Sequence, residues 1–261
     1  MFELSRDVLS GEPLHIAVAG VGGTGSEVIS GLVNLHHALV AFGYGGIRVS
    51  AFDPDMVSPA NIVRQRYTQA DLGRAKATTL INRVNLACGF DWLAFDRKFD
   101  GDAARGSWDV VVSCVDTRAA RRSLHKAAFA DGFRLWKFWL DIGNDETTGQ
   151  AILGTPRNRK KKVMHMLPCA TELHPELMDT SLPEDNRPSC SAIEALAKQD
   201  LFVNKRAALA GLDLLWELFH ERCLRHHGVY FDLRARMESP LTVMPKPKRE
   251  AAASLPPVCD E

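Results

Sequence analysis

Three glycines near the start of the sequence have a spacing that could bind a phosphate. Gly20, Gly22 and Gly25 follow the apolar run 14–19, and residues 26–39 after them have the apolar spacing that is typical of a helix. Glycines allow a tight turn in which backbone N–H groups approach phosphate oxygens at a helix start. The pattern alone fits NAD, FAD, S-adenosylmethionine or ATP, and it also fits a glycine-rich turn that binds nothing.

An acidic residue stands at the end of the next apolar run. Asp53 follows residues 47–52, where its carboxylate can accept hydrogen bonds from a ribose diol. The interval from the glycines is longer than the roughly 20 residues usual in dinucleotide-binding proteins. An insertion around residues 42–46 would explain the difference.

Polar and cationic residues follow Asp53 and distinguish between the candidate ligands. Asn61, Arg64 and Gln65 lie close together in the sequence, and Lys76 comes after them. Arg64 can bind phosphate oxygens through two donors, and Lys76 can supply a point charge, so the segment favours a nucleoside triphosphate. A nicotinamide or flavin oxidoreductase would leave these residues without a role, and both cations could also be ordinary surface charges.

A second carboxylate ends another predicted strand. Asp116 follows residues 109–115, a β-branched run that suits the middle of a parallel sheet. At the carboxyl end of a central strand, a carboxylate can hold a phosphate-bound Mg²⁺. Asp116 could instead only cap the helix that follows it.

Together these residues resemble the ThiF/MoeB/HesA superfamily of ubiquitin-activating-type adenylating enzymes, over about residues 14–222. The resemblance implies ATP and Mg²⁺ as cofactors. The implied ATP-site residues are Gly20, Gly22, Gly25, Asp53, Asn61, Arg64, Gln65 and Lys76, the implied metal ligand is Asp116, and the implied catalytic residues include Arg64, Lys76 and Asp116. Within the superfamily, residues 53–65 and 188–204 look most like the ThiF family protein of PRTRC plasmid systems.

The resemblance also implies an activity and partners. The expected reaction joins the terminal carboxylate of a small ubiquitin-like (β-grasp) protein to AMP and releases pyrophosphate, and the expected assembly is a homodimer. The arginine that MoeB-like dimers send into a partner's ATP site has no clear match, since only Arg6 precedes the first strand. A catalytically silent nucleotide-binding scaffold of a plasmid system is the second reading, and an oxidoreductase is the third.

One cysteine is a candidate nucleophile for a step after adenylation. Cys190 lies between an irregular stretch and an expected helix start, where helix N–H groups lower the pKa of a thiol. Its position also resembles that of the ThiF cysteine that follows the crossover segment. Cys169 is expected to lack a helix start. A thioester or acyl persulfide on Cys190 is therefore predicted as an addition to adenylation, which alone remains the default.

The elements that must position these residues predict an α/β fold with a Rossmann-like doubly wound sheet. Further strands are expected at 92–99 and 134–142, and further helices at 71–87 and 117–130. A nucleotide-binding core (14–142), a C-terminal extension (143–236) and a loose tail (237–261) are the expected divisions. The extension is predicted to hold a hairpin with strands 150–154 and 163–167, an irregular crossover at 168–188 and an apolar helix within 191–225 that packs on the sheet or on another subunit.

Composition and charge limit the other possibilities. The 261 residues include 32 basic and 32 acidic side chains, and 46% are hydrophobic. Such a chain has no broad basic field for nucleic acid, and the basic turn 157–162 is interpreted as a solvated loop tip. No apolar stretch reaches the roughly 20 residues of a membrane span. The first residues contain no apolar stretch long enough for a signal peptide, so a cytoplasmic protein is expected. The six cysteines form no CxxC pair and are expected to be reduced.

Overall fold

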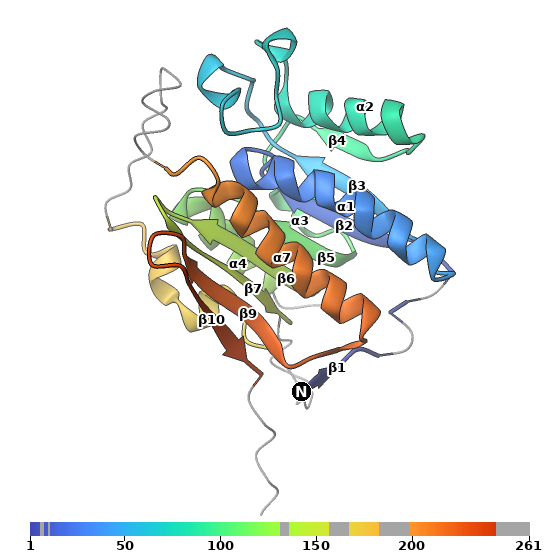
Figure 1. Ribbon diagram of the computed structural model, residues 1–261, viewed down its shortest axis with the longest axis vertical. Coiled ribbons are helices and arrows are strands. Elements are labelled where there is room, and N and C mark those ends of the chain that lie inside the picture. The colour runs from blue at the N-terminus through green and yellow to red at the C-terminus, as the bar shows by residue number, and fades with distance from the viewer. Residues whose placement is uncertain (6–7, 10, 131–135, 157–166, 183–198, 244–261) are drawn as a thin grey trace, which may run out of the picture.

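One eight-stranded sheet carries the fold, in the order β10-β9-β7-β6-β5-β2-β3-β4 (Figure 1). The structure is a computed structural model that describes residues 1–243 apart from 6–7, 10, 131–135, 157–166 and 183–198. The strands of the sheet are β2 (Leu14–Ala19), β3 (Ile47–Phe52), β4 (Leu93–Phe95), β5 (Trp108–Ser113), β6 (Trp136–Asn144), β7 (Thr148–Gly154), β9 (His226–Asp232) and β10 (Met237–Thr242). The helices are α1 (Gly23–Ala41), α2 (Lys76–Cys88), α3 (Gly101–Ala104), α4 (Arg118–Ala128), α5 (Ala170–Leu173) and α7 (Val203–His220). Shorter elements are β1 (Phe2–Glu3), β8 (Cys223–Leu224) and the turns η1 (Pro59–Asn61), η2 (Gln69–Asp71) and η3 (Pro175–Met178).

The sheet has a parallel half and an antiparallel half. Strands β2 to β6 pair in parallel, whereas β6, β7, β9 and β10 pair antiparallel in succession. From β2 the chain first moves outward through β3 and β4 and then returns to place β5 on the other side of β2. The loops after β2 and β5 therefore meet where the strand order reverses, which is where open α/β sheets bind ligands. The predicted Rossmann-like α/β fold is confirmed.

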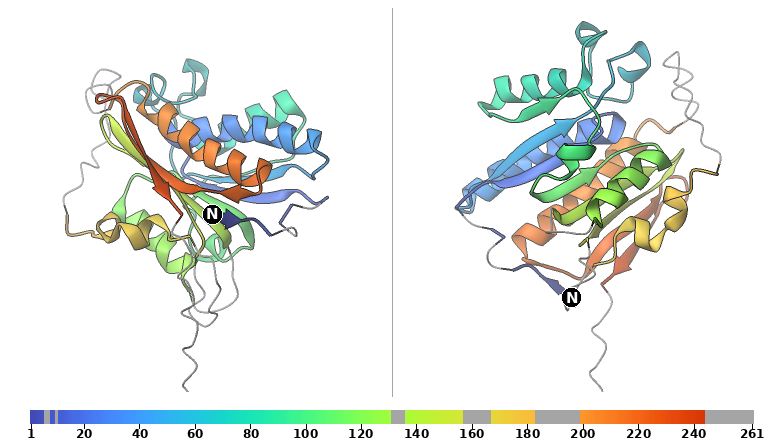
Figure 2. Two further views of the ribbon diagram at one scale, coloured as in Figure 1. Left: turned by 60° about the horizontal axis from the view of Figure 1, so that its bottom comes forward. Right: turned by 180° about the vertical axis from the view of Figure 1, so that it is seen from behind.

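Helices cover both faces of the sheet (Figures 1 and 2). Along β2, Ile16 and Val18 pack in the core beneath α1, α2 and α7, whereas Ala17 and Ala19 pack in the core beneath α3 and α4. This alternation follows from the two-residue repeat of a strand. Where both faces of a strand are covered, successive residues are apolar, as Ile16–Ala19 are, and this run could therefore be predicted from the sequence. No helix in the described part of the chain is long and apolar enough to cross a membrane.

The helix predicted at 71–87 begins later than expected, at Lys76. Gly73 has a left-handed backbone, with φ of +73°, and no α-helix continues through such a residue. Just before it, the Asp71 carboxylate accepts hydrogen bonds from the backbone N–H and the hydroxyl of Thr68, which closes the turn η2. Lys76 therefore lies in the first turn of α2 and not in its middle.

The C-terminal half differs from its sequence prediction in two ways. Residues 149–152 of β7 lie between β6 and β9 and pair with both. The expected pairing of residues 150–154 with 163–167 is therefore wrong for residues 150–152. Residues 157–166, with the basic turn, lie outside the described residues. The expected loose tail also begins too early, because Met237–Thr242 form β10 on the edge of the sheet. The domain divisions themselves stay a prediction.

The apolar helix predicted within 191–225 is α7, and it packs on the sheet as one of the two expected alternatives. Leu215 and Phe219 are fully buried in the core that α7 shares with α1. Leu209 and Trp216 point the other way and are exposed by 52% and 37%. One face of α7 thus packs in the core, and apolar residues on a second face are exposed at the surface.

The glycine loop between β2 and α1 depends on missing side chains. Gly20 has φ of +88°, and a Cβ there would lie 2.8 Å from the carbonyl oxygen of Cys114 in the loop after β5. A Cβ on Gly25 would overlap the carbonyl oxygen of Gly20. The first turn of α1 therefore sits directly against the carboxyl end of β2, and its N–H groups remain close to the turn.

We expect Gly25→Ala to lower the free energy of unfolding by about 1–3 kcal/mol, because the new methyl group meets a backbone oxygen that cannot move aside. Gly11→Ala is the matched control, since a Cβ there has nothing within 4 Å. Both substitutions change the unfolded chain in the same way. Urea unfolding of the two variants measures the difference, and equal stabilities would contradict the close approach at Gly25.

The edge strand β10 gives a second prediction. A variant that ends at Arg236 should be less stable than one that ends at Val243, by about 1 kcal/mol or more, because β9 loses its neighbour and exposes unpaired backbone groups. The ion pair of Arg206 with Glu238 is lost as well. Thermal unfolding followed by circular dichroism should show a difference of a few degrees. Identical transitions would mean that the tail begins at residue 237, as the sequence predicted.

Candidate functional site

The first turn of α1 is held in place by two asparagines from distant parts of the chain. Thr24 Oγ1 lies 2.8 Å from Asn144 Oδ1 at the end of β6 and 3.1 Å from Asn204 Oδ1 in α7. A Cβ on Gly23 would lie 2.6 Å from the Asn204 side chain. These contacts fix the start of the helix beside the glycine loop. The sequence analysis did not identify them, because each partner lies more than a hundred residues away from Thr24.

Asp53 is buried at the end of β3, where it joins two loops. Its carboxylate accepts hydrogen bonds from the backbone N–H of Val21 at 2.7 Å and of Asp55 at 2.8 Å. Burial raises the pKa of Asp53, while the Lys76 ammonium and the two backbone donors act in the opposite direction. The structure thus places Asp53 directly beside the glycine loop. Its predicted role towards a ribose stays a prediction.

Asn61 shapes the turn that presents Arg64 and Gln65. Its side-chain oxygen accepts a hydrogen bond from the backbone N–H of Ser58, and its backbone carbonyl accepts hydrogen bonds from the N–H groups of Arg64 and Gln65. A Cβ on Gly22 would lie 3.9 Å from Gln65 Nε2, so this turn reaches the glycine loop. Asn61 therefore has a positioning role that its sequence motif did not reveal.

Arg64 and Gln65 carry the clearest sign that this region binds a polar ligand. Nη1 of Arg64 donates a hydrogen bond to the side-chain oxygen of Gln199. Arg64 Nε and Gln65 Oε1 are both buried, and neither has a hydrogen-bond partner among the described residues. Burial also lowers the pKa of the Arg64 guanidinium. A buried polar atom without a partner costs about 1–3 kcal/mol, which a polar ligand in this pocket would remove.

Lys76 is buried at the start of α2 and makes one exposed ion pair. Its Nζ lies 3.0 Å from Asp55 Oδ2, and the Asp55 side chain is 63% exposed. Tyr67 links this region to the glycine loop, because its hydroxyl donates to the carbonyl of Val21 at 2.8 Å. The structure therefore gathers the glycines, Asp53, the Asn61 turn and Lys76 around a single loop.

Asp116 lies at the same edge of the sheet, in the loop after β5. This loop is tied to β2, because Cys114 N–H donates to the carbonyl of Ala19 at 2.8 Å. The helix cap that Asp116 could have supplied is made by Thr117, whose side chain accepts from the N–H of Ala120. Asp116 is exposed and lines a cleft. Capping is therefore not its role.

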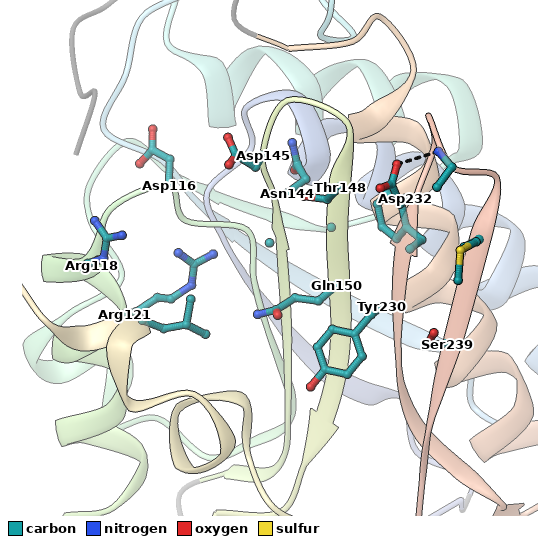
Figure 3. A pocket seen from close by; sticks show the side chains of 16 residues that line it. Asp116, Arg118, Arg121, Asn144, Asp145, Thr148, Gln150, Tyr230, Asp232 and Ser239 are labelled. Atoms are coloured by element: carbon teal, nitrogen blue, oxygen red, sulfur yellow. Dashed lines mark hydrogen bonds between the residues drawn. The ribbon is translucent and has the colours of Figure 1, made fainter. Parts of the chain in front are cut away.

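A cleft of about 820 Å³ opens on the side of Asp116 that faces the antiparallel half of the sheet (Figure 3). Its floor and walls come from α4, β6, β7, β9, β10 and their loops. The lining side chains labelled in the figure are Asp116, Arg118, Arg121, Asn144, Asp145, Thr148, Gln150, Tyr230, Asp232 and Ser239. The glycine loop, Asp53, Arg64 and Lys76 do not line it. Asp116 thus lines the cleft and directly follows the loop residues Cys114 and Val115, which lie against Gly20.

The cleft contains a buried polar network that the sequence analysis missed. Arg121 Nε lies 3.3 Å from both carboxylate oxygens of Asp141 in β6. Ser113 Oγ donates to Asp141 at 2.6 Å, and Trp139 Nε1 donates to Ser113 at 2.7 Å. The available signal was Asp141 itself, a charged residue within an apolar strand, because a buried carboxylate needs a cation or several donors.

The structure settles only part of the cysteine prediction. Cys190 lies outside the described residues. Cys169 does stand at a helix start, as the N-cap of α5, so the expectation that it lacks one is wrong. It is nevertheless fully buried, and a Cβ on Gly154 would lie 2.5 Å from its Sγ. Burial raises the pKa of Cys114 well above its ordinary value, as expected of a thiol packed inside the sheet.

Among the described residues no group of three or more His, Cys, Asp or Glu side chains could hold a metal ion. Asp116 is therefore a single candidate ligand. Mg²⁺ is commonly bound by one or two carboxylates together with the phosphates of a nucleotide. The exposed carboxylate of Asp116 beside the glycine loop fits such an ion and does not fit a zinc site, which takes three or four protein ligands.

Similar structures share this architecture. The crystal structure of PaaA is 14% identical in sequence, with a TM-score of 0.55, and the match covers 88% of this chain and 64% of PaaA. That of Escherichia coli MccB with ATP is 12% identical, with a TM-score of 0.58, and the match covers 91% of this chain and 66% of MccB. The structure of MccB with MccA gives 14% identity and a TM-score of 0.58, and the match covers 91% of this chain and 65% of that chain. This chain thus spans slightly less than two thirds of the length of each neighbour.

A second comparison concerns the sequence. No curated protein matches the chain. The model of the ThiF family matches residues 11–198, which include the glycine loop and every predicted ATP-site residue. The match covers well over half of the sequence, and the chain therefore belongs to the ThiF family.

Proposed function

We propose that the protein adenylates the terminal carboxylate of a small ubiquitin-like protein at the expense of ATP and releases pyrophosphate. The observation that carries this proposal is the pair of buried, unpartnered polar atoms on Arg64 and Gln65 beside the glycine loop. Membership of the ThiF family and the fold shared with MccB, which was crystallised with ATP, support ATP as the ligand. The ubiquitin-like nature of the substrate and the PRTRC subtype rest on the sequence resemblance.

The chemistry needs alignment and charge neutralisation more than acid–base catalysis. A carboxylate is already ionised at neutral pH, so one of its oxygens can attack the α-phosphorus without a general base. A bond forms between a carboxylate oxygen and the α-phosphorus as the bond from the α-phosphorus to the pyrophosphate oxygen breaks. Pyrophosphate leaves with the electron pair of the broken bond. Arg64 and Lys76 would neutralise the phosphate charge. A Mg²⁺ ion held by Asp116 would add further neutralisation when bound.

Lys76 is available for this task because its present partner holds it weakly. The partner carboxylate of Asp55 is largely exposed, and ion pairs with solvent on one side contribute at most about 1 kcal/mol. A polyphosphate carries more charge than Asp55 and would compete well for the ammonium. Among the described residues, the Arg64 side chain is bound to one neutral amide, Gln199, and a phosphate oxygen would replace this bond with a stronger one between opposite charges.

The cleft beyond Asp116 is the proposed binding place of the substrate terminus. Its lining includes Asp116, the residue predicted to hold the metal, and does not include the glycine loop. A chain terminus that reaches the α-phosphate from this side would not displace the nucleotide. MccB was crystallised with MccA, which supports a small peptide or protein as the substrate class.

A homodimer stays a prediction from the family resemblance. Phe42 at the end of α1 and Leu209 and Trp216 of α7 are exposed by 57%, 52% and 37% and offer an apolar contact surface. Phe42 and Trp216 lie close together, with ring centroids 6.1 Å apart. The mass in solution, measured by analytical ultracentrifugation, decides between one chain and two.

A second step on Cys190 also stays a proposal. In it the thiolate attacks the carbonyl carbon of the acyl adenylate, a carbon–sulfur bond forms, and AMP leaves with the electron pair of the broken bond. The alternative is an enzyme that stops at the adenylate. Cys169 is a poor rival nucleophile because its side chain is fully buried.

We expect the purified protein, with ATP, Mg²⁺ and its ubiquitin-like partner, to catalyse exchange between ATP and pyrophosphate. Asp116→Ala should abolish this exchange. Arg64→Ala and Lys76→Ala should each reduce it by more than tenfold, because each removes charge stabilisation worth on the order of 2–4 kcal/mol at the transition state. Radiolabelled pyrophosphate incorporation measures all three variants.

Arg74→Ala is the matched control for Lys76→Ala, since Arg74 is an exposed cation two residues earlier and should leave exchange unchanged. Undiminished exchange by Asp116→Ala would contradict the metal assignment. ATP binding without exchange in the unaltered protein would favour a catalytically silent scaffold. Binding of reduced nicotinamide or flavin cofactors in place of ATP would favour an oxidoreductase.

The cysteine step predicts a thiol-sensitive conjugate. After incubation with ATP and the partner, a non-reducing gel should show a protein–partner band that disappears with dithiothreitol. Cys190→Ala should abolish the band and leave pyrophosphate exchange intact, whereas Cys169→Ala should retain the band. A band that depends on Cys169 would mean that the nucleophile is misassigned. Exchange without any band would mean that the reaction ends at the adenylate.

A further inference from the structure

Two hydrogen-bond donors converge on the floor of the cleft above Gly143. Gly143 in β6 is paired directly with Gln150 in β7, so their side-chain positions share one face of the sheet. The missing side chain of Gly143 leaves a space there. A Cβ at Gly143 would lie 2.9 Å from Arg121 Nη2 and 3.8 Å from Gln150 Nε2. Figure 3 shows Arg121 and Gln150 pointing towards each other across this space.

Arg121 is held rigidly but keeps donors free for a ligand. The residue is only 7% exposed, and its Nε is committed to Asp141. No hydrogen bond from its Nη atoms to any described residue is present, and the residue is part of the cleft lining. The Gln150 amide is likewise without a side-chain partner in the described part of the chain. A buried guanidinium fixed at one edge and open at the other is well suited to orient a ligand.

The charge balance indicates which kind of acceptor fits between these donors. Arg121 and Asp141 together are neutral, and Gln150 is neutral as well. The carboxylates of Asp116 and Asp145 also line the cleft and would repel a further anion at its floor. A neutral oxygen, such as a peptide carbonyl, can accept from both donors without this repulsion. Arg118, the other cation of the lining, carries one charge against the three carboxylates of Asp116, Asp145 and Asp232, so the cleft stays unfavourable for a second carboxylate at its floor.

We propose that Arg121 and Gln150 bind a main-chain carbonyl oxygen of the substrate, so that the substrate enters the cleft as an extended peptide segment and not as a small free acid. The inference rests on the proposed function for the direction of the segment, whose terminus would point towards Asp116. Gly143 stands near the carboxyl end of β6, the edge of the parallel sheet from which the Asp116 loop also emerges. Arg121 is thus a specificity-determining residue.

Two small probes test the carbonyl directly. Triglycine and ω-aminooctanoic acid have the same main-chain length and the same charged ends, and they differ only in the two amides. Titrated into the full-length ¹⁵N-labelled protein without ATP, triglycine should bind about tenfold more tightly, as expected for one added hydrogen bond to a charged donor. The backbone amide of Gly143 and the Nε–H of Arg121 report the binding by NMR.

Three variants locate the preference. Arg121→Lys keeps the charge opposite Asp141 but moves the donor, and Gln150→Ala removes the second donor. Gly143→Ala places a methyl group beside both donors, where it blocks the approach of a carbonyl oxygen. Each should reduce the preference to about threefold or less. Arg122→Gln removes a cation from the next position of α4, outside the cleft lining, and should keep it. If Arg121→Lys fails to fold, the other two variants carry the test.

The proposal is overturned if the unaltered protein binds both probes equally or binds neither. It is also overturned if the preference survives in Gln150→Ala and Gly143→Ala, or if Arg121→Lys weakens both probes by the same factor, which would assign Arg121 to the carboxylate. Because ATP is absent, the outcome is independent of the adenylation proposal. A failed pyrophosphate exchange with an intact triglycine preference would refute only the chemistry.

Discussion

The candidate site depends on the contact between the start of α1 and the carboxyl end of β2. A Cβ on Gly25 would overlap the backbone oxygen of Gly20, so the helix can approach the strand only because a glycine occupies this position. Neighbouring segments of the chain then form hydrogen bonds with the resulting loop. Asp53 binds the N–H of Val21 and Tyr67 binds its carbonyl, so one residue of the loop fixes both the end of β3 and the segment that leads to Lys76. A shift of the loop would therefore move every predicted ATP-site residue.

A second constraint lies across the point where the strand order reverses. On the parallel side, Asp53 and Lys76 surround the glycine loop, and on the antiparallel side the pair of Arg121 and Asp141 supports the cleft. Asp116 lies between the two, in a loop that emerges from β5. The proposed chemistry needs a nucleotide and a peptide terminus to meet at one phosphorus atom. Asp116 lines the cleft and follows the loop that packs against Gly20, so a peptide terminus in the cleft and a nucleotide at the glycine loop would approach the same residue.

The parts of the fold that could be predicted are those in which burial dictates the sequence locally. The strands at 14–19 and 47–52 have the observed bounds because both faces are covered from the third residue onward, which leaves a mostly apolar run after the exposed His15 and Arg48. The strand β10 was missed for the opposite reason, since most of its side chains are exposed and the run reads as polar tail. The predicted neighbour of residues 150–152 of β7 was wrong because β9 lies beside them, and β9 follows α7 in the chain and not a short turn after β7.

The site follows the same rule. Arg64, Gln65 and Lys76 could be predicted because their motif is local in sequence. The roles of Asn61, Asn204 and Arg121 could not, because they depend on which backbone atom or which distant carboxylate faces each side chain. Gly143 illustrates the limit most clearly. From the sequence alone, Gly143 indicates only the end of a strand. Its role in the proposed site comes from Arg121 and Gln150, two side chains of other elements that lie beside the position of its missing side chain.

The charged groups around the glycine loop also show why a ligand should be favoured there. Burial lowers the pKa of Arg64 and raises that of Asp53, so in both cases the surroundings disfavour the charged form that a nucleotide would use. The buried Nε of Arg64 and Oε1 of Gln65 add the cost of two unpaired polar atoms among the described residues. These penalties are present in the folded chain before any ligand arrives. Binding that supplies phosphate oxygens and hydroxyl groups removes them, and the free energy released adds to the affinity for the nucleotide and to the stability of the complex.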